Sequence, residues 1–265
     1  MVAETTQERQ PMLSVRGIVK RFGGLTAVNK VDLDVYPGEV VGLVGDNGAG
    51  KSTLIKCVSG VHQADEGEIF FGGARVHIAH PSAAREMGIE TIYQDLALAG
   101  NLHVGANIFL GREVKKEYLG GVVKVLDETH MLTESEKVLD SLDIHIPSLT
   151  QEINNLSGGQ RQAVAIARAL YWDARLMIMD EPTNNLGVVE QRKVLSLIRT
   201  LRDRQVPVIL ISHSIHDVFA VSDRIVVLRR GRKVTEKVAS ETNSEEVVQY
   251  IVGARDDTRE EIPAN

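Results

Sequence analysis

The sequence predicts an α/β fold with a mainly parallel sheet, and three observations support this prediction. Residues 176–179 and 208–211 are short, entirely apolar runs, which are typical of parallel strands buried on both faces. Between these runs, residues 189–203 carry apolar side chains at helical spacing. Strands that alternate with helices indicate a doubly wound sheet, in which ligands bind at the carboxyl ends of the strands.

The first part of the chain is expected to consist mostly of strands. Residues 31–36 alternate apolar and polar side chains, which is the pattern of a half-buried strand. The apolar run 40–44 indicates a buried strand that leads directly into a glycine-rich loop, and residues 52–59 are expected to form a helix after that loop. Further strands are expected over residues 12–19, 67–71 and 89–93.

The middle of the chain shows a different pattern. Between residues 101 and 151 the strand-like runs vanish, and helix-like stretches occupy residues 104–110 and 134–142. This change predicts an inserted, mainly helical lobe. The α/β pattern then returns, with a strand expected over residues 225–228 and a helix over residues 244–252.

The chain is therefore predicted to form one domain over residues 1–265. Its α/β core comprises residues 1–98 and 160–253, and the helical lobe is inserted over about 99–159. Residues 254–265 are charged and are expected to form a mobile tail.

Composition and charge exclude several classes of function. The chain has a formal net charge of −6, and only 4% of its residues are aromatic. A nucleic-acid surface needs clustered Lys and Arg, and base stacking needs aromatic side chains, so we expect no nucleic-acid partner. The single cysteine, Cys57, excludes an intrachain disulfide, fits a reducing setting and is expected to be a small core residue.

The sequence also bears on the relation to a membrane. No apolar run approaches the roughly 18 residues that a membrane-spanning helix needs. Residues 1–10 are polar and do not resemble a secretory signal. We therefore expect that any role at a membrane depends on a separate membrane subunit.

A phosphate-binding loop is predicted between the strand at 40–44 and the helix that follows it. The segment Gly45-Asp-Asn-Gly-Ala-Gly-Lys-Ser52 matches the pattern G-x-x-x-x-G-K-[ST]. Its glycines let backbone N–H groups close around a β-phosphate, and the helix N-terminus adds partial positive charge. Lys51 can reach the β- and γ-phosphates of ATP, and the Ser52 hydroxyl can bind Mg²⁺. An ordinary glycine-rich turn is the alternative. The predicted ATP-binding residues of this loop are Gly45, Asp46, Asn47, Gly48, Ala49, Gly50, Lys51, Ser52 and Thr53.

Two carboxylates follow the apolar run 176–179. At the end of a buried strand near a phosphate loop, such acids hold Mg²⁺ and activate water. Asp180 is predicted to orient the metal, and Glu181 is predicted to be the general base for the attacking water. The alternative is a strand that simply ends in solvated acids.

A third motif points to a family. Residues 156–160 read Leu-Ser-Gly-Gly-Gln and open an amphipathic helix for which Ser157 is a plausible N-cap. This segment resembles the signature motif of the ABC ATPase family. The resemblance implies that Ser157, Gly158 and Gly159 contact the γ-phosphate of an ATP molecule held by a second copy of the chain.

Other marks of this family occur in order along the chain. Gln94 matches its glutamine loop, which implies contact with nucleotide and Mg²⁺, and His213 matches its catalytic switch histidine. Phe22 stands where the family places an aromatic ring on the adenine. The alternatives are a surface glutamine, an ordinary loop histidine and a core aromatic.

The resemblance covers about residues 13–233. It implies a P-loop NTPase core with a mainly parallel sheet, an antiparallel β part near the N-terminus and an inserted helical lobe.

One branch of the family is especially similar. Residues 88–97, 101–112 and 160–168 look like the importers of ribose, xylose and fructose. This implies an ATPase at the cytoplasmic face of a membrane, which energises uptake of a simple sugar through a separate permease. A periplasmic sugar-binding protein would then be an indirect partner.

The motifs also predict a dimer. The chain has one phosphate loop and one signature, so it is expected to pair with a second copy on binding ATP. Gly187 departs from the family, which usually has an aspartate there, and the departure is expected to weaken communication between the two sites. Three alternatives stay open: an importer of another small solute, a non-transport ABC ATPase, and a nucleotide-binding regulator without turnover.

Overall fold

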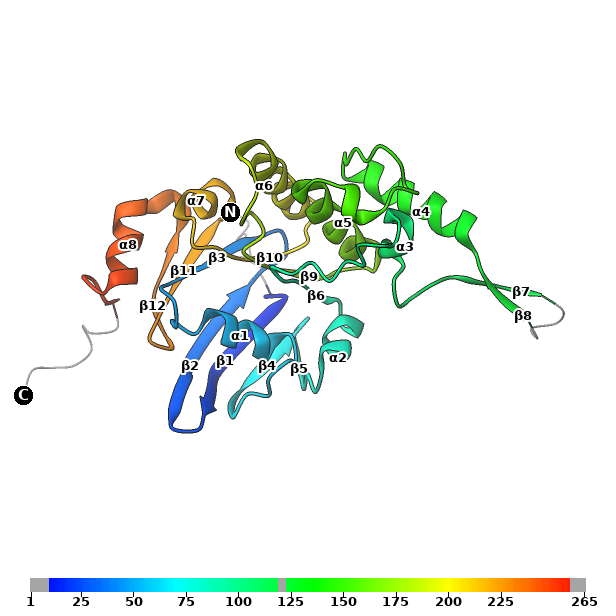
Figure 1. Cartoon of the computed structure of the whole chain (residues 1–265). Helices are drawn as coiled ribbons and strands as arrows, with labels where there is room; N and C mark the ends of the chain where they lie inside the picture. Colours follow the sequence, from blue (N-terminus) through cyan, green and yellow to red (C-terminus); the bar gives the residue numbers. More distant parts are fainter. Residues whose placement is uncertain (1–9, 119–122, 258–265) are drawn as a thin grey trace, which may run out of the picture. The chain divides into compact units, whose positions relative to one another are not determined.

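The computed structural model describes residues 10–118 and 123–257. The chain divides into two compact units, which are described separately (Figure 1). Unit 1 comprises residues 1–91, 175–180 and 201–265, and unit 2 comprises residues 92–174 and 181–200. Unit 2 is wider than the lobe expected over about 99–159, because it also includes residues 92–98, 160–174 and 181–200.

The expected antiparallel part is a four-stranded sheet of unit 1. Its strand order is β2-β1-β4-β5, and every neighbouring pair is antiparallel. The strands are β1 (Leu13–Phe22), β2 (Leu25–Val35), β4 (Glu66–Phe71) and β5 (Ala74–Val76).

The second sheet has six strands in the order β12-β11-β3-β10-β9-β6. The strands β11, β3, β10 and β9 run parallel to one another, and β12 pairs with β11 in the antiparallel sense. This order confirms the predicted mainly parallel sheet. The strands are β3 (Val40–Val44), β6 (Ile89–Ile92), β9 (Leu176–Asp180), β10 (Val208–Ile211), β11 (Arg224–Arg229) and β12 (Arg232–Val238).

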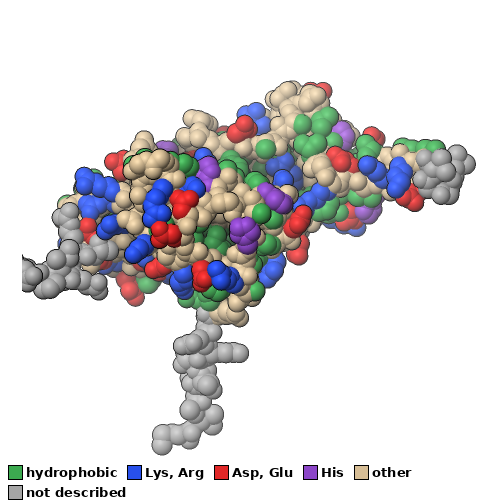
Figure 2. All heavy atoms as spheres, turned by 90° about the horizontal axis from the view of Figure 1, so that it is seen from below, with side chains coloured by type: hydrophobic (Ala, Val, Ile, Leu, Met, Phe, Trp, Pro, Cys, Tyr) green, Lys and Arg blue, Asp and Glu red, His purple; other side chains and the backbone are tan. Residues whose placement is uncertain are grey.

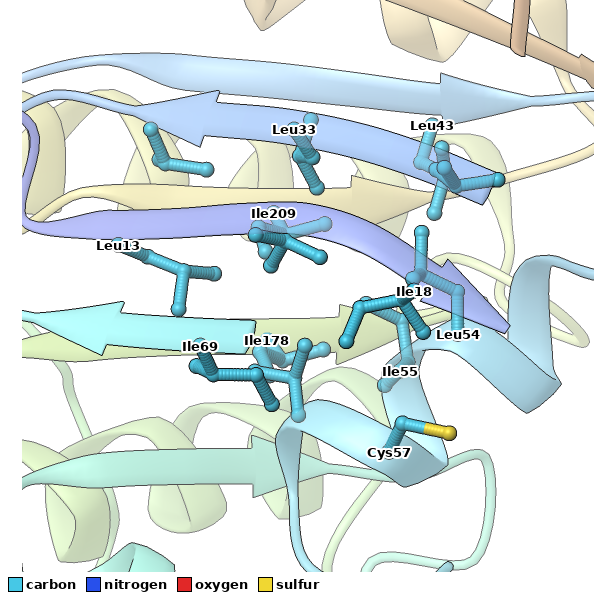
Figure 3. Packing of buried hydrophobic residues seen from close by; sticks show 14 of the residues in the cluster. Leu13, Ile18, Leu33, Leu43, Leu54, Ile55, Cys57, Ile69, Ile178 and Ile209 are labelled. Carbon is cyan, nitrogen blue, oxygen red and sulfur yellow. The ribbon is translucent and has the colours of Figure 1, made fainter. Parts of the chain in front are cut away.

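Helix α1 (Lys51–Val58) packs into the main core of unit 1 (Figure 3). Its Leu54 and Ile55 lie in one buried cluster with Leu33 of the antiparallel sheet and Ile209 of the six-stranded sheet. Burying a side chain of this size contributes about 1.5–3 kcal/mol. The core therefore fixes the helix that carries the glycine-rich loop.

Cys57 on α1 belongs to this core, as predicted. Burial raises the pKa of its thiol to about 11, so the thiolate that reactive cysteines need is scarce at neutral pH.

Further helices complete unit 1. Val218 and Val247 pack on Ile225 and Val227 of β11 in a second core cluster, which joins α7 and α8 to the sheet. The helices of this unit are α2 (Pro81–Glu86), α7 (Ile215–Val221), α8 (Ser244–Val252) and the 3-10 helix η3 (Ala239–Glu241).

The end of the described chain, where a mobile tail is expected from residue 254, makes contacts with unit 1. Asp256 pairs with Arg229 at 2.6 Å, and the Asp257 carboxylate accepts hydrogen bonds from Thr235 and Tyr250, both at 2.6 Å. Side chains 256 and 257 thus contact the sheet and α8, and the mobility expected from residue 254 stays a prediction. Residues 258–265 lie outside the described part of the chain.

Unit 2 is mainly helical. Its Phe109 is buried beside Tyr171 and Trp172, and the Trp172 indole donates a hydrogen bond to the Ile108 carbonyl at 2.9 Å. The helices are α3 (Val104–Ile108), α4 (Glu128–Ser141), the 3-10 helix η2 (Ile153–Asn155), α5 (Gly158–Tyr171) and α6 (Val188–Asp203), whose last residues belong to unit 1.

The expectation that strands vanish between residues 101 and 151 is wrong. The strands β7 (Lys115–Tyr118) and β8 (Val123–Leu126) form an antiparallel two-stranded sheet. All four residues of β8 are exposed, and Lys124 pairs with Glu117 across the ladder at 2.8 Å. The two strands pair through their backbones, although Val123, Val125 and Leu126 of β8 are apolar and exposed.

The surface carries charges of both signs. On the face shown in Figure 2, Lys and Arg side chains are interspersed with Asp and Glu. Over residues 10–118 and 123–257, no helix is both long and apolar enough to cross a membrane.

Candidate nucleotide-binding site

The glycine-rich loop leaves β3 and enters α1 through a backbone that requires glycine at two points. A Cβ on Gly45 would lie 2.2 Å from the Leu228 carbonyl oxygen, so no larger residue fits there. Gly50 is the N-cap of α1 and has φ of 103°, which an L side chain rarely adopts. The loop is also tied to the rest of unit 1, because Gly231 donates its N–H to the Ala49 carbonyl at 3.0 Å.

Lys51 and the start of α1 give the loop its positive character. The Lys51 ammonium donates to the carbonyl oxygens of Gly45 at 2.7 Å and Asp46 at 3.2 Å, so it lies over the loop. No side chain of the described residues caps the N-terminus of α1. The first N–H groups of a helix have no partner within the helix and favour an anion.

A hollow of about 550 Å³ joins this loop to the predicted adenine-stacking residue. Phe22 lines the hollow and is 44% exposed, with its ring edge-on to His62 at 5.2 Å between centroids. The structure thus places Phe22 beside the loop rather than in the core. The sequence motifs missed other residues that line the same hollow: Leu25, Thr26, Ala27, Arg230 and Gly231.

The carboxyl ends of three parallel strands bring further predicted residues to one edge of the six-stranded sheet. Asp180 pairs in register with Ile211 of β10, and Ile211 pairs with Leu43 of β3. Adjacent strands lie about 4.8 Å apart, so Asp180 lies two strands, or roughly 10 Å, from the strand that enters the loop. His213 follows β10 at the same edge and is exposed.

Ser52 and Asp180 suit a magnesium ion chemically. Mg²⁺ prefers hard oxygen ligands and usually completes its shell with water and substrate phosphates. The Ser52 hydroxyl lines the hollow beside the loop, and the Asp180 carboxylate stands at the end of β9. Both residues belong to unit 1, whereas Gln94, the third predicted ligand, belongs to unit 2. In the described part of the chain, no group of three or more His, Cys, Asp or Glu side chains could hold a metal ion.

Unit 2 brings Gln94 and Glu181 together. Both line a hollow of about 370 Å³, which also includes Gly158 at the start of α5. Glu181 has φ of 55°, an uncommon backbone conformation for a residue other than glycine. Such strain occurs often at functional sites, where the surrounding structure maintains it.

The signature segment forms a capped helix start. The Ser157 side chain accepts a hydrogen bond from the Gln160 N–H at 3.3 Å, and the Gln160 side chain accepts from the Ser157 N–H at 3.0 Å. This reciprocal pair is a capping box. A Cβ on Gly158 would lie 2.6 Å from the Leu186 side chain, so glycine permits close contact with the segment that follows Glu181.

Glu190 completes this region, and the sequence motifs did not indicate it. Its carboxylate accepts a hydrogen bond from the Gly187 N–H, and the polar groups of Ser157, Gly187 and Gly159 around it hold its pKa below the ordinary value. The Gly187 contact measures 3.3 Å. An acid in the first turn of α6 is visible in the sequence, but its contact with a second helix depends on tertiary packing.

The comparisons with known proteins agree with this geometry. Residues 28–184 match the family model described as ABC transporter. The chain is 49% identical to a xylose/arabinose import ATP-binding protein of Sulfolobus acidocaldarius, over 91% of this chain and 93% of that protein. It is 43% identical to a fructose import ATP-binding protein of Rhizobium meliloti, over 97% of this chain and 99% of that protein.

A solved structure gives the same result for the fold. A nucleotide-free ATP-binding cassette from an ABC transporter superposes with a TM-score of 0.77 at 26% identity, covering 92% of this chain and 96% of that one. The family match spans more than half of the chain, and the two import proteins match it over nearly their whole length. The chain therefore belongs to the ABC transporter family and has the fold of its ATP-binding cassette.

Proposed function

We propose that this chain is the ATP-binding and ATP-hydrolysing subunit of an ABC importer, and that it energises uptake of a simple sugar through a separate membrane permease. The observation that carries the ATPase assignment is the uncapped start of α1, where the loop and the Lys51 ammonium face the hollow that Phe22 also lines. The relatives named for xylose/arabinose and fructose import support the sugar.

Each predicted site residue has a role in this proposal. The residues of the loop 45–53 hold the phosphates, and Phe22 contacts the adenine. Ser52, Asp180 and Gln94 would hold Mg²⁺, which stabilises charge on the phosphates when it is bound. Glu181 takes a proton from the attacking water, and His213 contacts the γ-phosphate.

The signature segment acts on the nucleotide of a second copy of the chain. Its hydrogen-bond donors, Ser157, Gly158 and Gly159, contact the γ-phosphate of the ATP that the second copy holds, so two chains close on two ATP molecules. The start of α5 supports this role, because it presents backbone N–H groups of a helix N-terminus and a hydroxyl. The permease docks on unit 2 near Gln94, on the cytoplasmic face of the membrane, and receives the sugar from a periplasmic binding protein.

Reconstitution tests the transport assignment. The chain, a candidate permease and a candidate sugar-binding protein from the same genome would be placed in liposomes, and phosphate release would be measured with xylose, fructose or ribose outside. We expect sugar to stimulate ATP hydrolysis, and we expect the same assembly with Glu181→Gln to show no stimulation. Hydrolysis that responds only to another class of solute would replace the sugar assignment. An assembly without any hydrolysis would overturn the proposed function.

A further inference from the structure

An anion of the same chain lies beside the start of α5. The carboxyl carbon of Glu190 would lie 3.5 Å from a Cβ built on Gly159, and Ser157 and Gly159 are close enough to the carboxylate to lower its pKa. The Gly187 N–H donates to the same group at 3.3 Å. A carboxylate therefore lies beside a helix N-terminus, where negative charge is favourable.

Close packing supports this arrangement independently of the hydrogen bonds. A Cβ built on Gly159 would lie 3.0 Å from Cβ and 3.2 Å from Cγ of Glu190. The stem of Glu190 therefore lies directly against the first turn of α5. A larger residue at position 159 would push this side chain away from the helix start by a few tenths of an ångström.

A carboxylate and a phosphate cannot use these donors together. Both groups are negative and accept the same N–H and O–H groups, so one must leave before the other binds. We propose that Glu190 is an internal competitor for the hydrogen-bond donors of the signature segment: its carboxylate must move away from Ser157 and Gly159 before the γ-phosphate held by a second copy can engage them. This inference rests on the proposed function, since it assumes that the signature contacts that nucleotide.

Gly187 favours the observed position of the Glu190 carboxylate. A Cβ on Gly187 would lie 3.9 Å from Glu190 Oε2, so an aspartate there would bring a second carboxylate next to the first. Glycine removes this repulsion and offers its N–H instead. The departure from the family pattern thus stabilises Glu190 on the signature, and it raises the ATP concentration that closure of the dimer requires.

The test measures that concentration. Closure is trapped with Glu181→Gln, and the fraction of dimer is followed by analytical ultracentrifugation as Mg-ATP is raised. Adding Glu190→Gln keeps the shape but replaces a charge-assisted acceptor with a neutral one, which is about half as strong. We expect the half-saturating ATP concentration to fall about threefold with Glu190→Gln, and about tenfold with Glu190→Ala, because hydrogen bonds to charged groups are the stronger class.

The control is Glu134→Gln, which removes a carboxylate from α4 in the same unit, where Glu134 pairs with Lys137 at 2.7 Å. It should leave the half-saturating concentration unchanged. If the Glu190 variants need as much ATP as their parent or more, Glu190 only supports the fold and the inference is wrong. If the Glu181→Gln parent fails to dimerise at any ATP concentration, the proposed shared site itself is wrong.

Discussion

The starts of α1 and α5 both offer backbone N–H groups to an anion, but the chain treats them in opposite ways. Helix α1 begins after Gly50, and none of the described side chains caps it. Helix α5 begins with the capping box of Ser157 and Gln160, and Glu190 adds a carboxylate. The first helix start thus has no side-chain cap among the described residues, whereas the second has a capping box and a carboxylate beside it. This difference fits the proposed function, in which the first start binds ATP within one chain and the second engages ATP only across a dimer.

The largest expected effect comes from Glu181, the proposed general base. It would act on an ATP molecule that lies between the start of α1 in one copy and the start of α5 in the other. Glu181→Gln leaves both starts unchanged and removes only the proton acceptor. Turnover should fall by about 10²–10⁴, the range for loss of a general base, while ATP still binds. Phosphate release and ATP titration on the same preparation measure the two quantities. Turnover within twofold of the wild type would remove Glu181 from the mechanism.

The next effect tests the open helix start. Lys51→Ala removes the ammonium that lies over the loop. ATP affinity should fall by about 100-fold, because hydrogen bonds between charged groups contribute about 1.5–3 kcal/mol each. Titration with a fluorescent ATP analogue measures the affinity. Lys56→Ala, in the last turn of the same helix, is the control and should bind ATP like the wild type. Equal affinities for the two variants would contradict the assignment of the loop.

A smaller effect is expected on stability: a capped helix start should lose unfolding free energy when its capping side chain is removed, and an uncapped one should not. Ser157→Ala removes an N-cap and should lower the free energy of unfolding by about 1 kcal/mol. Ser52→Ala, at the second residue of α1, removes a hydroxyl that caps nothing and should leave stability unchanged. Urea unfolding of the nucleotide-free chains measures both. A similar loss in both variants would mean that α1 is capped as well.

The smallest effect concerns Gly187. Its backbone does not have a positive φ, so Gly187→Asp introduces no backbone strain. The new carboxylate should strengthen coupling between the two sites, and the Hill coefficient for ATP hydrolysis with the permease present should rise. Strong cooperativity in the wild type that Gly187→Asp does not change would show that coupling runs through other residues.

Local signals in the sequence predicted most of the core. The strand over residues 208–211 and the helix over residues 244–252 have the predicted bounds, because complete burial and helical apolar spacing leave clear patterns. The pair of β7 and β8 was missed because three of the four residues of β7 are charged and the short apolar run of β8 is exposed. Helix α7 was also missed, since only Asp217, Val218 and Val221 of its seven residues are buried.

The candidate site also contains residues that could be predicted from the sequence and residues that could not. The loop 45–52 could be predicted because strand, loop and helix are consecutive in the chain, so one motif contains the whole feature. Glu190 could not be predicted, because it reaches Ser157 only through the packing of α6 against α5. Motifs report residues that act within one segment, whereas contacts between segments require the fold.

The central claim is that two copies share each site, and mixing two variants tests it most directly. Ser157→Arg disables the signature, Lys51→Ala disables the loop, and neither should hydrolyse ATP alone. A mixed dimer keeps one intact pair of loop and signature. An equal mixture should therefore recover up to about a quarter of the wild-type rate, since half of its dimers are mixed. Wild-type hydrolysis by Ser157→Arg as the only species present would contradict the claim.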